Sequence, residues 1–413
     1  MSVRSPEVPR LVARTVEIPD PGDLTTLLPA GDPMTWLRRG EGFVAWGRAV
    51  THESTGKDRF SDATAWWHEL VRVAAIADEV EIPGSGLIAL GSFAFADRPG
   101  DSILVVPQVV VGKHGDHCFL TTIGTNDQPT PELLAQAEPR PPSNLTFADG
   151  ALSGAEWEGV VWDAVLRLNS GDLDKVVLAR DLVATADEPV DVRWPLRRLA
   201  TQYDMCWTFH VDGLFGATPE MLVRREKGLV TSRVLAGTIR RTGDDEHDLT
   251  LAATLARSSK DLEEHEYAVR SVADALAPYC SSMNVPEAPF VLHLPNVMHL
   301  ATDVAGVTHT TGANVLELAA ALHPSAAVGG TPTKLAVDLI DEIEGMDRGR
   351  YAGPVGWIDA HGDGEFGIAL RSAELRGEQV RLFAGCGIVA GSDPESELAE
   401  SQAKFIPVRD ALS

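Results

Sequence analysis

The sequence predicts an α+β fold in which strands and helices are intermixed along the whole chain. Long apolar strands are separated irregularly by amphipathic helices, without the regular strand–helix–strand alternation of a parallel α/β sheet. The 413 residues are 44% hydrophobic and 23% charged, which is typical of a globular protein with a large core. The sequence shows no fixed-period repeat and no low-complexity tract, so we expect these elements alone to build the core.

The first third of the chain consists mainly of short apolar runs separated by turns. A Pro-rich stretch, AEPRPPSNLT at residues 137–146, follows it, and by composition this stretch is either a linker or a long surface loop. The patterns before it predict strands over 41–50, 86–96 and 102–113 and a helix over 63–80.

The remaining two thirds of the chain carry longer elements. Lys227–Gly228 predicts the turn of a hairpin over 221–237. Asp393–Pro394 predicts the start of a closing helix, with Asp as N-cap and Pro as the first helical residue. The other predicted elements are strands over 175–184, 206–213, 297–308, 355–375 and 379–391, a helical stretch over 244–280 that is broken once, and helices over 154–171, 314–322 and 333–345.

The formal net charge of −25 limits the classes of partner. Nucleic acid and anionic membrane surfaces both require a basic footprint, so we expect neither as a partner. An anionic substrate would need a locally positive site within this acidic protein, and a divalent cation is one way to provide it.

Cysteine usage and the amino terminus point to an intracellular protein. Neither a CxxC pair nor an apolar signal core is present, and no run approaches the roughly 18 apolar residues of a membrane span. We therefore expect a soluble, cytoplasmic protein without a zinc site or a disulfide framework. The four cysteines are Cys118, Cys206, Cys280 and Cys386.

Two acidic pairs stand out because their spacing places both carboxylates on one helix face. Glu397 and Glu400 lie in the closing helix, followed by Lys404, and Asp261 and Glu264 repeat the spacing in KDLEEHE. Two helices facing one another with such pairs would enclose a hard cation, and Mg²⁺ suits carboxylates and water. The alternative is an ordinary solvated helix face.

Two further residues are candidates for proton transfer. Lys175 begins an apolar strand, where a lysine held among apolar groups favours its neutral amine and acts as a base. Glu220 follows a Gly–Ala–Thr–Pro turn before another apolar strand, where a carboxyl group stays protonated and serves as a general acid. The alternatives are a strand-end lysine and a turn carboxylate that both face water.

Glycine-containing segments offer backbone N–H groups to an anion. They are LAGTIRR, which contains Gly237, and FAGCGIVAG, which contains Gly385 and Gly387.

Taken together and in order, these segments resemble the chorismate-utilising enzymes, a family of isochorismate, salicylate, anthranilate and aminodeoxychorismate synthases. The resemblance implies one α+β domain of two large antiparallel sheets packed as a core, with helices outside. It implies a divergent part over 1–145 and a catalytic core over 150–409, so the Pro-rich stretch is interpreted as a loop. The matching stretches are KVVLAR, GATPE, LAGTIRR, KDLEEHEYAV, MHLATDV, LHPSAAVGGTPTKLA, RYAGPVGW, ALRSAEL and AGCGIVAGSDPESELAESQAK.

The resemblance also implies a role for each matching residue. Glu264 and Glu400 would bind Mg²⁺, directly or through water, assisted by Asp261 and Glu397, and the metal would hold the ring carboxylate of chorismate beside Lys404. The pyruvyl carboxylate would meet Arg371, Tyr351 and the amides around Gly385 and Gly387. Gly237 and Thr238 would line the pocket, with His299 near the ring hydroxyl.

Two positions favour the isochorismate synthases, which serve menaquinone or siderophore synthesis. Water-adding members carry Lys at position 175, whereas anthranilate synthases usually carry Gln there, because water needs a base and ammonia does not. Ala236 stands where aminodeoxychorismate synthases often carry a lysine that forms an adduct. We therefore expect Lys175 to activate water for attack at C2 and Glu220 to protonate the departing C4 hydroxyl.

Two alternatives remain open. Salicylate synthase makes isochorismate and then eliminates pyruvate, but such lyases tend to carry Thr where this chain has Ala327. The second is a catalytically silent homologue that acts as a binding subunit, against which Lys175 and Glu220 argue. The resemblance implies a monomer, because water-using members of the family are often monomers. We expect no amidotransferase subunit, because ammonia chemistry is not indicated.

Overall fold

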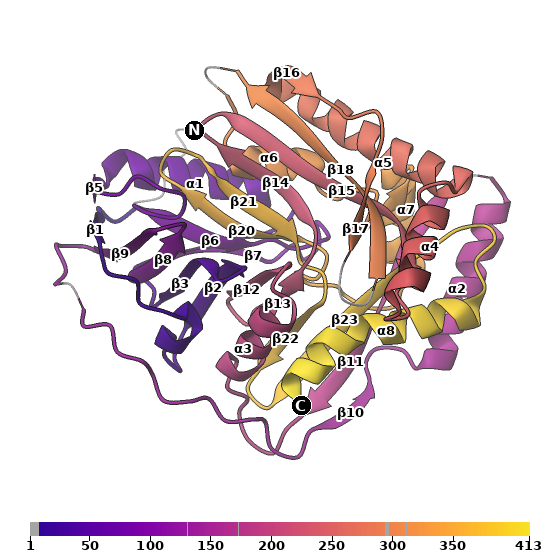
Figure 1. Ribbon diagram of the computed structural model, residues 1–413, viewed down its shortest axis with the longest axis horizontal. Helices are drawn as coiled ribbons and strands as arrows, with labels where there is room; N and C mark the ends of the chain where they lie inside the picture. Colours follow the sequence, from indigo (N-terminus) through magenta and orange to yellow (C-terminus); the bar gives the residue numbers. More distant parts are fainter. Residues whose placement is uncertain (1–7, 130, 172, 294–296, 310–311) are drawn as a thin grey trace, which may run out of the picture.

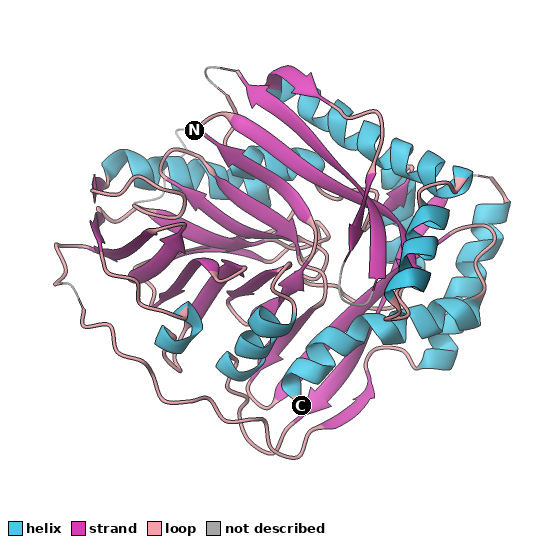
Figure 2. Ribbon diagram, in the orientation of Figure 1, coloured by secondary structure: helices cyan, strands magenta, loops and turns pink. Residues whose placement is uncertain are grey.

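Two large β-sheets form the centre of the protein, and helices lie on their outer sides (Figures 1 and 2). The structure is a computed structural model that describes residues 8–129, 131–171, 173–293, 297–309 and 312–413. The side chains of Thr238, Lys260 and Glu264 lie outside this description.

The first sheet has 13 strands within the described residues, and only its β1–β5 pair is parallel. In order across the sheet, the strands are β10 (Thr146–Asp149), β11 (Lys175–Thr185), β23 (Gln379–Ile388), β22 (Ser372–Arg376), β13 (Leu214–Thr218), β12 (Trp207–Val211), β2 (Pro33–Arg38), β3 (Glu41–Trp46), β8 (Val109–His114), β9 (His117–Gly124), β1 (Val12–Glu17) and β5 (Ala75–Asp78), with β19 (Gly330–Thr331) paired to β11.

The second sheet has 10 strands in the described part of the chain, all paired antiparallel. Its order is β16 (Cys280–Asn284), β18 (Val297–Thr308), β15 (Leu229–Arg240), β14 (Met221–Glu226), β21 (Gly364–Ile368), β20 (Pro354–Asp359), β6 (Ile88–Ser92), β7 (Ser102–Val106) and β4 (Val50–Ser54), with β17 (Phe290–His293) paired to β18.

The helices divide between the two sheets (Figure 1). Those that contact the second sheet are α1 (Arg59–Val73), α4 (Asp245–Leu255), α5 (Ser259–Leu276) and α6 (Val315–Leu322), with the 3₁₀ turn η2 (Ala277–Tyr279) after α5. Those that contact the first sheet are α2 (Gly154–Asn169), α3 (Arg193–Gln202), α7 (Thr333–Ile343) and α8 (Pro394–Leu412), with the 3₁₀ turn η1 (Leu24–Leu27).

The two sheets share one apolar core. Its largest buried cluster extends in sequence from Leu11 to Ile388 and draws on strands of both sheets. For example, Phe43 of the first sheet packs edge-to-face on Trp357 of the second, with ring centroids 5.6 Å apart. The predicted α+β class, with two packed antiparallel sheets and outer helices, is confirmed. The proposed single domain, with its parts at 1–145 and 150–409, stays a prediction.

Several predicted element boundaries are confirmed by local chemistry. Lys227 and Gly228 both have positive φ angles, of 47° and 83°, as the tight hairpin between β14 and β15 requires. The Asp393 side chain accepts a hydrogen bond from the backbone N–H of Ser396 at 3.0 Å, so Asp393 is the N-cap of α8.

The four predicted elements of the first third were wrong in extent. The strands expected over 41–50 and 86–96 are shorter, at Glu41–Trp46 and Ile88–Ser92. The helix expected over 63–80 ends at Val73, because Ala75–Asp78 instead forms a strand paired with β1. The strand expected over 102–113 is two strands in different sheets, β7 and β8. Pro107 separates them, and proline has no N–H with which to continue a ladder.

The Pro-rich stretch is attached to the body of the protein, as expected of a surface loop. The backbone carbonyl of Ala137 accepts a hydrogen bond from Arg193 at 3.2 Å, and Glu138 forms an ion pair with Arg197. Both arginines belong to α3, so the first residues of the stretch lie against that helix.

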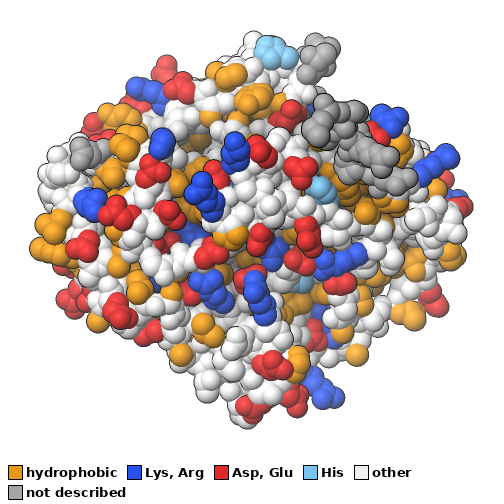
Figure 3. All heavy atoms as spheres, turned by 180° about the vertical axis from the view of Figure 1, so that it is seen from behind, with side chains coloured by type: hydrophobic (Ala, Val, Ile, Leu, Met, Phe, Trp, Pro, Cys, Tyr) orange, Lys and Arg blue, Asp and Glu red, His pale blue; other side chains and the backbone are white. Residues whose placement is uncertain are grey.

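The surface mixes charges of both signs. Figure 3 shows acidic and basic side chains interspersed over the face seen from behind, rather than gathered into a basic patch. Among the described helices, none is both long enough and apolar enough to cross a lipid bilayer.

Candidate active site

A cavity of about 550 Å³ lies where strands of both sheets meet α5 and α8. Every predicted site residue whose side chain the structure describes lines it. These residues are Lys175, Glu220, Gly237, Asp261, His299, Ala327, Tyr351, Arg371, Gly385, Gly387, Glu397, Glu400 and Lys404.

Two predicted residues have undescribed side chains. The backbone of Thr238 follows Gly237 in β15 and pairs with His299 of β18. Glu264 belongs to α5, three residues after Asp261, but its side chain lies outside the described residues. Their predicted roles therefore stay predictions.

Glu220 lies where the chain passes from β13 in the first sheet to β14 in the second. Its backbone carbonyl accepts a hydrogen bond from Ile368 N–H at 3.0 Å, which ties this crossing to β21. The carboxyl group is buried, and burial raises its pKa to about 7. The positive charges of Lys175, Arg371 and Lys404 lower the pKa, but burial outweighs them. A large fraction of Glu220 therefore carries a proton near neutral pH, as a general acid requires.

Arg371 lies at a later crossing, where the chain returns from β21 to β22 in the first sheet. It has a left-handed backbone with φ of 49°, and its carbonyl accepts a hydrogen bond from Ala217 N–H at 3.2 Å. A non-glycine residue in this conformation stores about 1–3 kcal/mol of strain, and neighbouring strands must hold it. The two crossings thus place the predicted acid and the predicted carboxylate ligand beside one another.

Lys175 enters the same cavity from the first residue of β11. Its backbone pairs with Thr331 of β19, and its side chain is half-buried. A Cβ added at Gly387 would lie 2.8 Å from Lys175 Cε, so the lysine side chain lies directly against that glycine. This placement favours a lysine directed into the cavity over a strand-end lysine that faces bulk water.

Helix α8 contributes an ammonium and two carboxylates to the cavity. Lys404 donates hydrogen bonds through Nζ to the carbonyl of Gly385 at 2.7 Å and to Glu400 at 2.6 Å. Burial favours protonation of Glu400, but the charge and hydrogen bond of Lys404 outweigh it and lower the pKa. Glu397 accepts a hydrogen bond from Ser392 at 2.7 Å, although burial still raises the pKa of Glu397.

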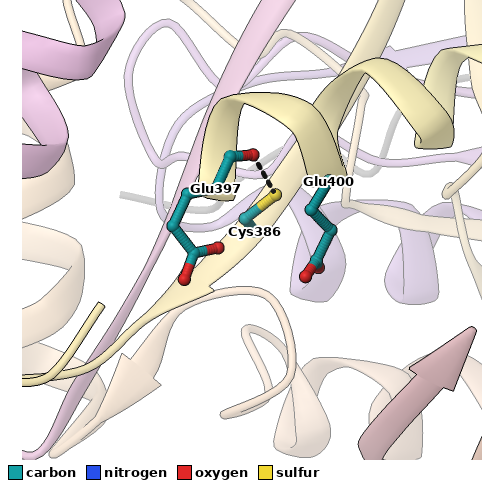
Figure 4. A group of neighbouring side chains, drawn as sticks. All are labelled: Cys386, Glu397 and Glu400. Atoms are coloured by element: carbon teal, nitrogen blue, oxygen red, sulfur yellow. Dashed lines mark hydrogen bonds between the residues drawn. The ribbon is translucent and has the colours of Figure 1, made fainter. Parts of the chain in front are cut away.

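The acidic cluster fits a hard divalent cation. Ligand atoms of Glu397, Glu400 and Cys386 all lie within 4.8 Å of one another, and Figure 4 shows the two carboxylates on the same side of α8. Burial raises the pKa of Cys386 to about 12, so it stays a thiol, and its Sγ lies 3.4 Å from the Glu397 carbonyl. The two carboxylates, with Asp261 in the same cavity, provide the oxygen donors that Mg²⁺ prefers.

Two further polar side chains of the cavity, His299 and Tyr351, are neutral. Burial, with the charges of Arg371 and Lys404, lowers the pKa of His299 to about 4, so its imidazole is uncharged at neutral pH. Tyr351 stacks on Phe383 with ring centroids 4.9 Å apart, and burial raises the pKa of its hydroxyl. Both can hydrogen-bond a ligand without adding charge.

Comparison with known proteins identifies the family. The family model for chorismate binding enzymes matches residues 29–413. The chain belongs to this family. The resemblance inferred from its motifs is therefore confirmed.

Named relatives of this chorismate-binding enzyme are isochorismate synthases. It is 38% identical over 261 residues to isochorismate synthase MenF of Bacillus subtilis, covering 62% of this chain but only 55% of that protein. It is 34% identical over 439 residues to the salicylate biosynthesis isochorismate synthase of Pseudomonas aeruginosa, covering 98% of this chain and 90% of the other. The structure of the menaquinone-specific isochorismate synthase MenF of Escherichia coli superposes with a TM-score of 0.81 at 25% identity, covering 100% of this chain and 97% of that one.

An anionic substrate requires a locally positive site, but the side chains that line this cavity do not provide one by themselves. Without a metal, its described lining is not net positive. The basic side chains are Lys175, Arg348, Arg371 and Lys404, and the acidic ones are Glu220, Asp261, Asp393, Glu397 and Glu400, so the acidic groups outnumber the basic ones. A bound divalent cation would tip this balance toward an anionic ligand.

Sequence reasoning missed Arg348 and Ser392, which also line the cavity. Arg348 is buried and paired with Glu344 four residues earlier, a spacing that in sequence looks like any surface ion pair. Ser392 lies just before the predicted N-cap of α8, where a serine usually indicates a turn. In both cases only the fold shows that the side chain faces the site.

Replacing Gly387 with alanine should lower the kcat of the reaction catalysed in this cavity about 10- to 100-fold, because the new methyl group would displace the end of the Lys175 side chain. The thermal midpoint should change little, since the contact is with a flexible side chain. Gly391→Ala is the matched control, because Gly391 lines the same cavity with nothing within 4 Å of an added Cβ. Equal kcat values for the two variants would contradict the placement of Lys175.

Proposed function

We propose that this protein is an isochorismate synthase, which isomerises chorismate to isochorismate by adding water at ring C2 with loss of the C4 hydroxyl. The observation that carries the proposal is that Lys175 and the buried Glu220 line one cavity with Arg371 and Lys404. The names of the relatives support the same activity.

In the proposed reaction, the two candidate residues move two protons. Neutral Lys175 takes a proton from a water molecule as its oxygen forms a bond to C2. The ring double bonds shift, the C4–O bond breaks, and protonated Glu220 gives its proton to the departing hydroxyl, which leaves as water. Lys175 ends as an ammonium and Glu220 as a carboxylate, and both return to their starting forms through solvent.

The remaining residues bind and orient the substrate. Arg371 offers a planar guanidinium that suits the pyruvyl carboxylate, joined by Tyr351 and the amides around Gly385 and Gly387. Lys404 attracts the ring carboxylate, and neutral His299 meets the ring hydroxyl. We propose that Gly237 and Thr238 line the pocket beside it, and Gly237 has φ of 76°, which a glycine adopts without strain.

We also propose Mg²⁺ as the cofactor, held by Glu400 and Glu264 with Asp261 and Glu397 in support. When bound, it would supply positive charge to the ring carboxylate. Glu400→Gln should weaken binding of Mn²⁺, used as a paramagnetic probe, at least about tenfold.

Glu395→Gln provides the control for metal binding, because Glu395 is an exposed residue of the same helix and does not line the cavity. Electron paramagnetic resonance of free Mn²⁺ measures binding without chorismate. Equal Mn²⁺ affinity in Glu400→Gln, Glu395→Gln and the wild type would contradict the metal assignment.

Incubating chorismate with the protein, with and without Mg²⁺, tests the function. The proposal predicts isochorismate without release of pyruvate. Salicylate and pyruvate would instead indicate a salicylate synthase, which Ala327 in the cavity wall argues against. No product at all would indicate a silent binding subunit.

The setting of the enzyme is also part of the proposal. We propose a cytoplasmic monomer that works without an amidotransferase subunit. Its product would enter menaquinone or siderophore synthesis.

A further inference from the structure

A buried ion pair lies at the edge of the cavity, beneath the strand that carries Lys175. Arg348 donates to both carboxylate oxygens of Glu344, through Nε at 2.7 Å and Nη2 at 2.5 Å. Both side chains are almost fully buried, with 3% and 1% exposed. Arg348 also stacks over the Phe95 ring at 4.2 Å.

The Glu344–Arg348 pair forms hydrogen bonds with two backbone groups of β11 that follow Lys175 in the strand. Arg348 Nη2 donates to the carbonyl of Val177 at 2.7 Å, and Ala179 N–H donates to Glu344 at 2.7 Å. These contacts lie two and four residues beyond Lys175, on the same stretch of backbone.

The same arginine holds the segment that lies across from Lys175. Its Nη1 donates to the carbonyl of Val328 at 2.9 Å, next to Ala327 in the cavity wall. That segment continues into β19, where Thr331 pairs with Lys175. The guanidinium of Arg348 therefore bonds both to β11, which carries Lys175, and to the segment that pairs with the start of β11.

Stability alone is a poor reason for such a pair. Desolvation of two buried charges offsets most of their attraction, and well-packed apolar residues are often as stable. A planar guanidinium, in contrast, sets the relative position of three groups at once, and a lysine ammonium does not reproduce that fork.

We propose that Glu344 and Arg348 are positioning residues that set the strand of Lys175 against the segment 327–330. This inference rests on the proposed function, in which Lys175 delivers its amine to a water molecule at C2. The pair itself does not touch the reacting atoms; it holds the backbone that aims Lys175.

The test is the kinetics of Arg348→Lys with chorismate. A base displaced by about 1 Å loses roughly 100-fold in rate, so kcat should fall about 10- to 100-fold. KM should stay within about threefold, because the carboxylate-binding residues Arg371 and Lys404 are retained.

Arg193→Lys is a matched control. Arg193 is also buried, pairs through two nitrogens with Asp191, and donates to the carbonyls of Leu28 and Ala137, but it does not line the cavity. The two variants should lose similar amounts of thermal stability, whereas Arg193→Lys should keep kcat within about twofold of the wild type.

Glu344→Gln is a second variant, expected to lower kcat as Arg348→Lys does. The proposal is overturned if the folded variants keep the wild-type kcat, if the loss falls on KM, or if Arg193→Lys loses as much kcat. Unfolding of both Arg348→Lys and Glu344→Gln at the assay temperature also contradicts it, since a purely structural role then suffices. A wild-type protein that forms no isochorismate would instead refute the proposed function.

Discussion

Lys175→Ala is expected to lower kcat for isochorismate formation by about 10²- to 10⁴-fold, the range that a positioned general base contributes. Water at neutral pH is a poor nucleophile, and Lys175 is the base that we propose removes its proton. The same variant should still bind chorismate in the presence of Mg²⁺, because Arg371 and Lys404 remain. Stopped assays of isochorismate and calorimetric titration of chorismate separate these two effects.

Lys334→Ala is the control for this experiment. Lys334 is an exposed lysine of α7, paired with Asp338 at the surface, and it does not line the cavity. It should leave both kcat and binding unchanged. A near-normal kcat in Lys175→Ala would refute the assignment of the base.

Glu220→Gln is expected to lower kcat by a similar factor of about 10²–10⁴, because the amide occupies the same space but gives up no proton. The pH dependence follows from the raised pKa. With a pKa of about 7, Glu220 is protonated and active below that value and ionised above it, so kcat/KM of the wild type should decline as pH rises through about 7.

The residual activity of Glu220→Gln should lack that decline. Asp359→Asn is the control for pH, because burial raises the pKa of Asp359 to about 6, yet Asp359 does not line the active cavity. The decline should persist in Asp359→Asn. If it disappears there and stays in Glu220→Gln, Glu220 is not the acid.

The chemistry of the site was largely predictable from local sequence. Helical spacing alone pairs Glu397 with Glu400, and an N-cap Asp with a following Pro marks the start of their helix. The ordered motifs then place Lys175, Glu220 and Arg371 in one site, and the structure brings all three to one cavity.

What sequence reasoning missed depends on contacts between distant segments. Arg348 donates hydrogen bonds to the carbonyls of Val177 and Val328, which are 171 and 20 residues away in the sequence. Residues Ala75–Asp78 form a strand because they pair with β1, and the helical pattern of the preceding residues does not indicate that pairing. Local patterns carry no information on either partner.

The origin of the new hydroxyl tests the central claim most directly. In H₂¹⁸O, wild-type protein with chorismate and Mg²⁺ should yield isochorismate with one ¹⁸O at the C2 hydroxyl, because the proposed mechanism has Lys175 activate solvent water. Mass spectrometry measures the ¹⁸O content of the isochorismate. The samples are taken early, before the reverse reaction exchanges the label. Isochorismate whose C2 hydroxyl carries only the ¹⁶O of chorismate would show that the hydroxyl migrates within the substrate, and would contradict the account.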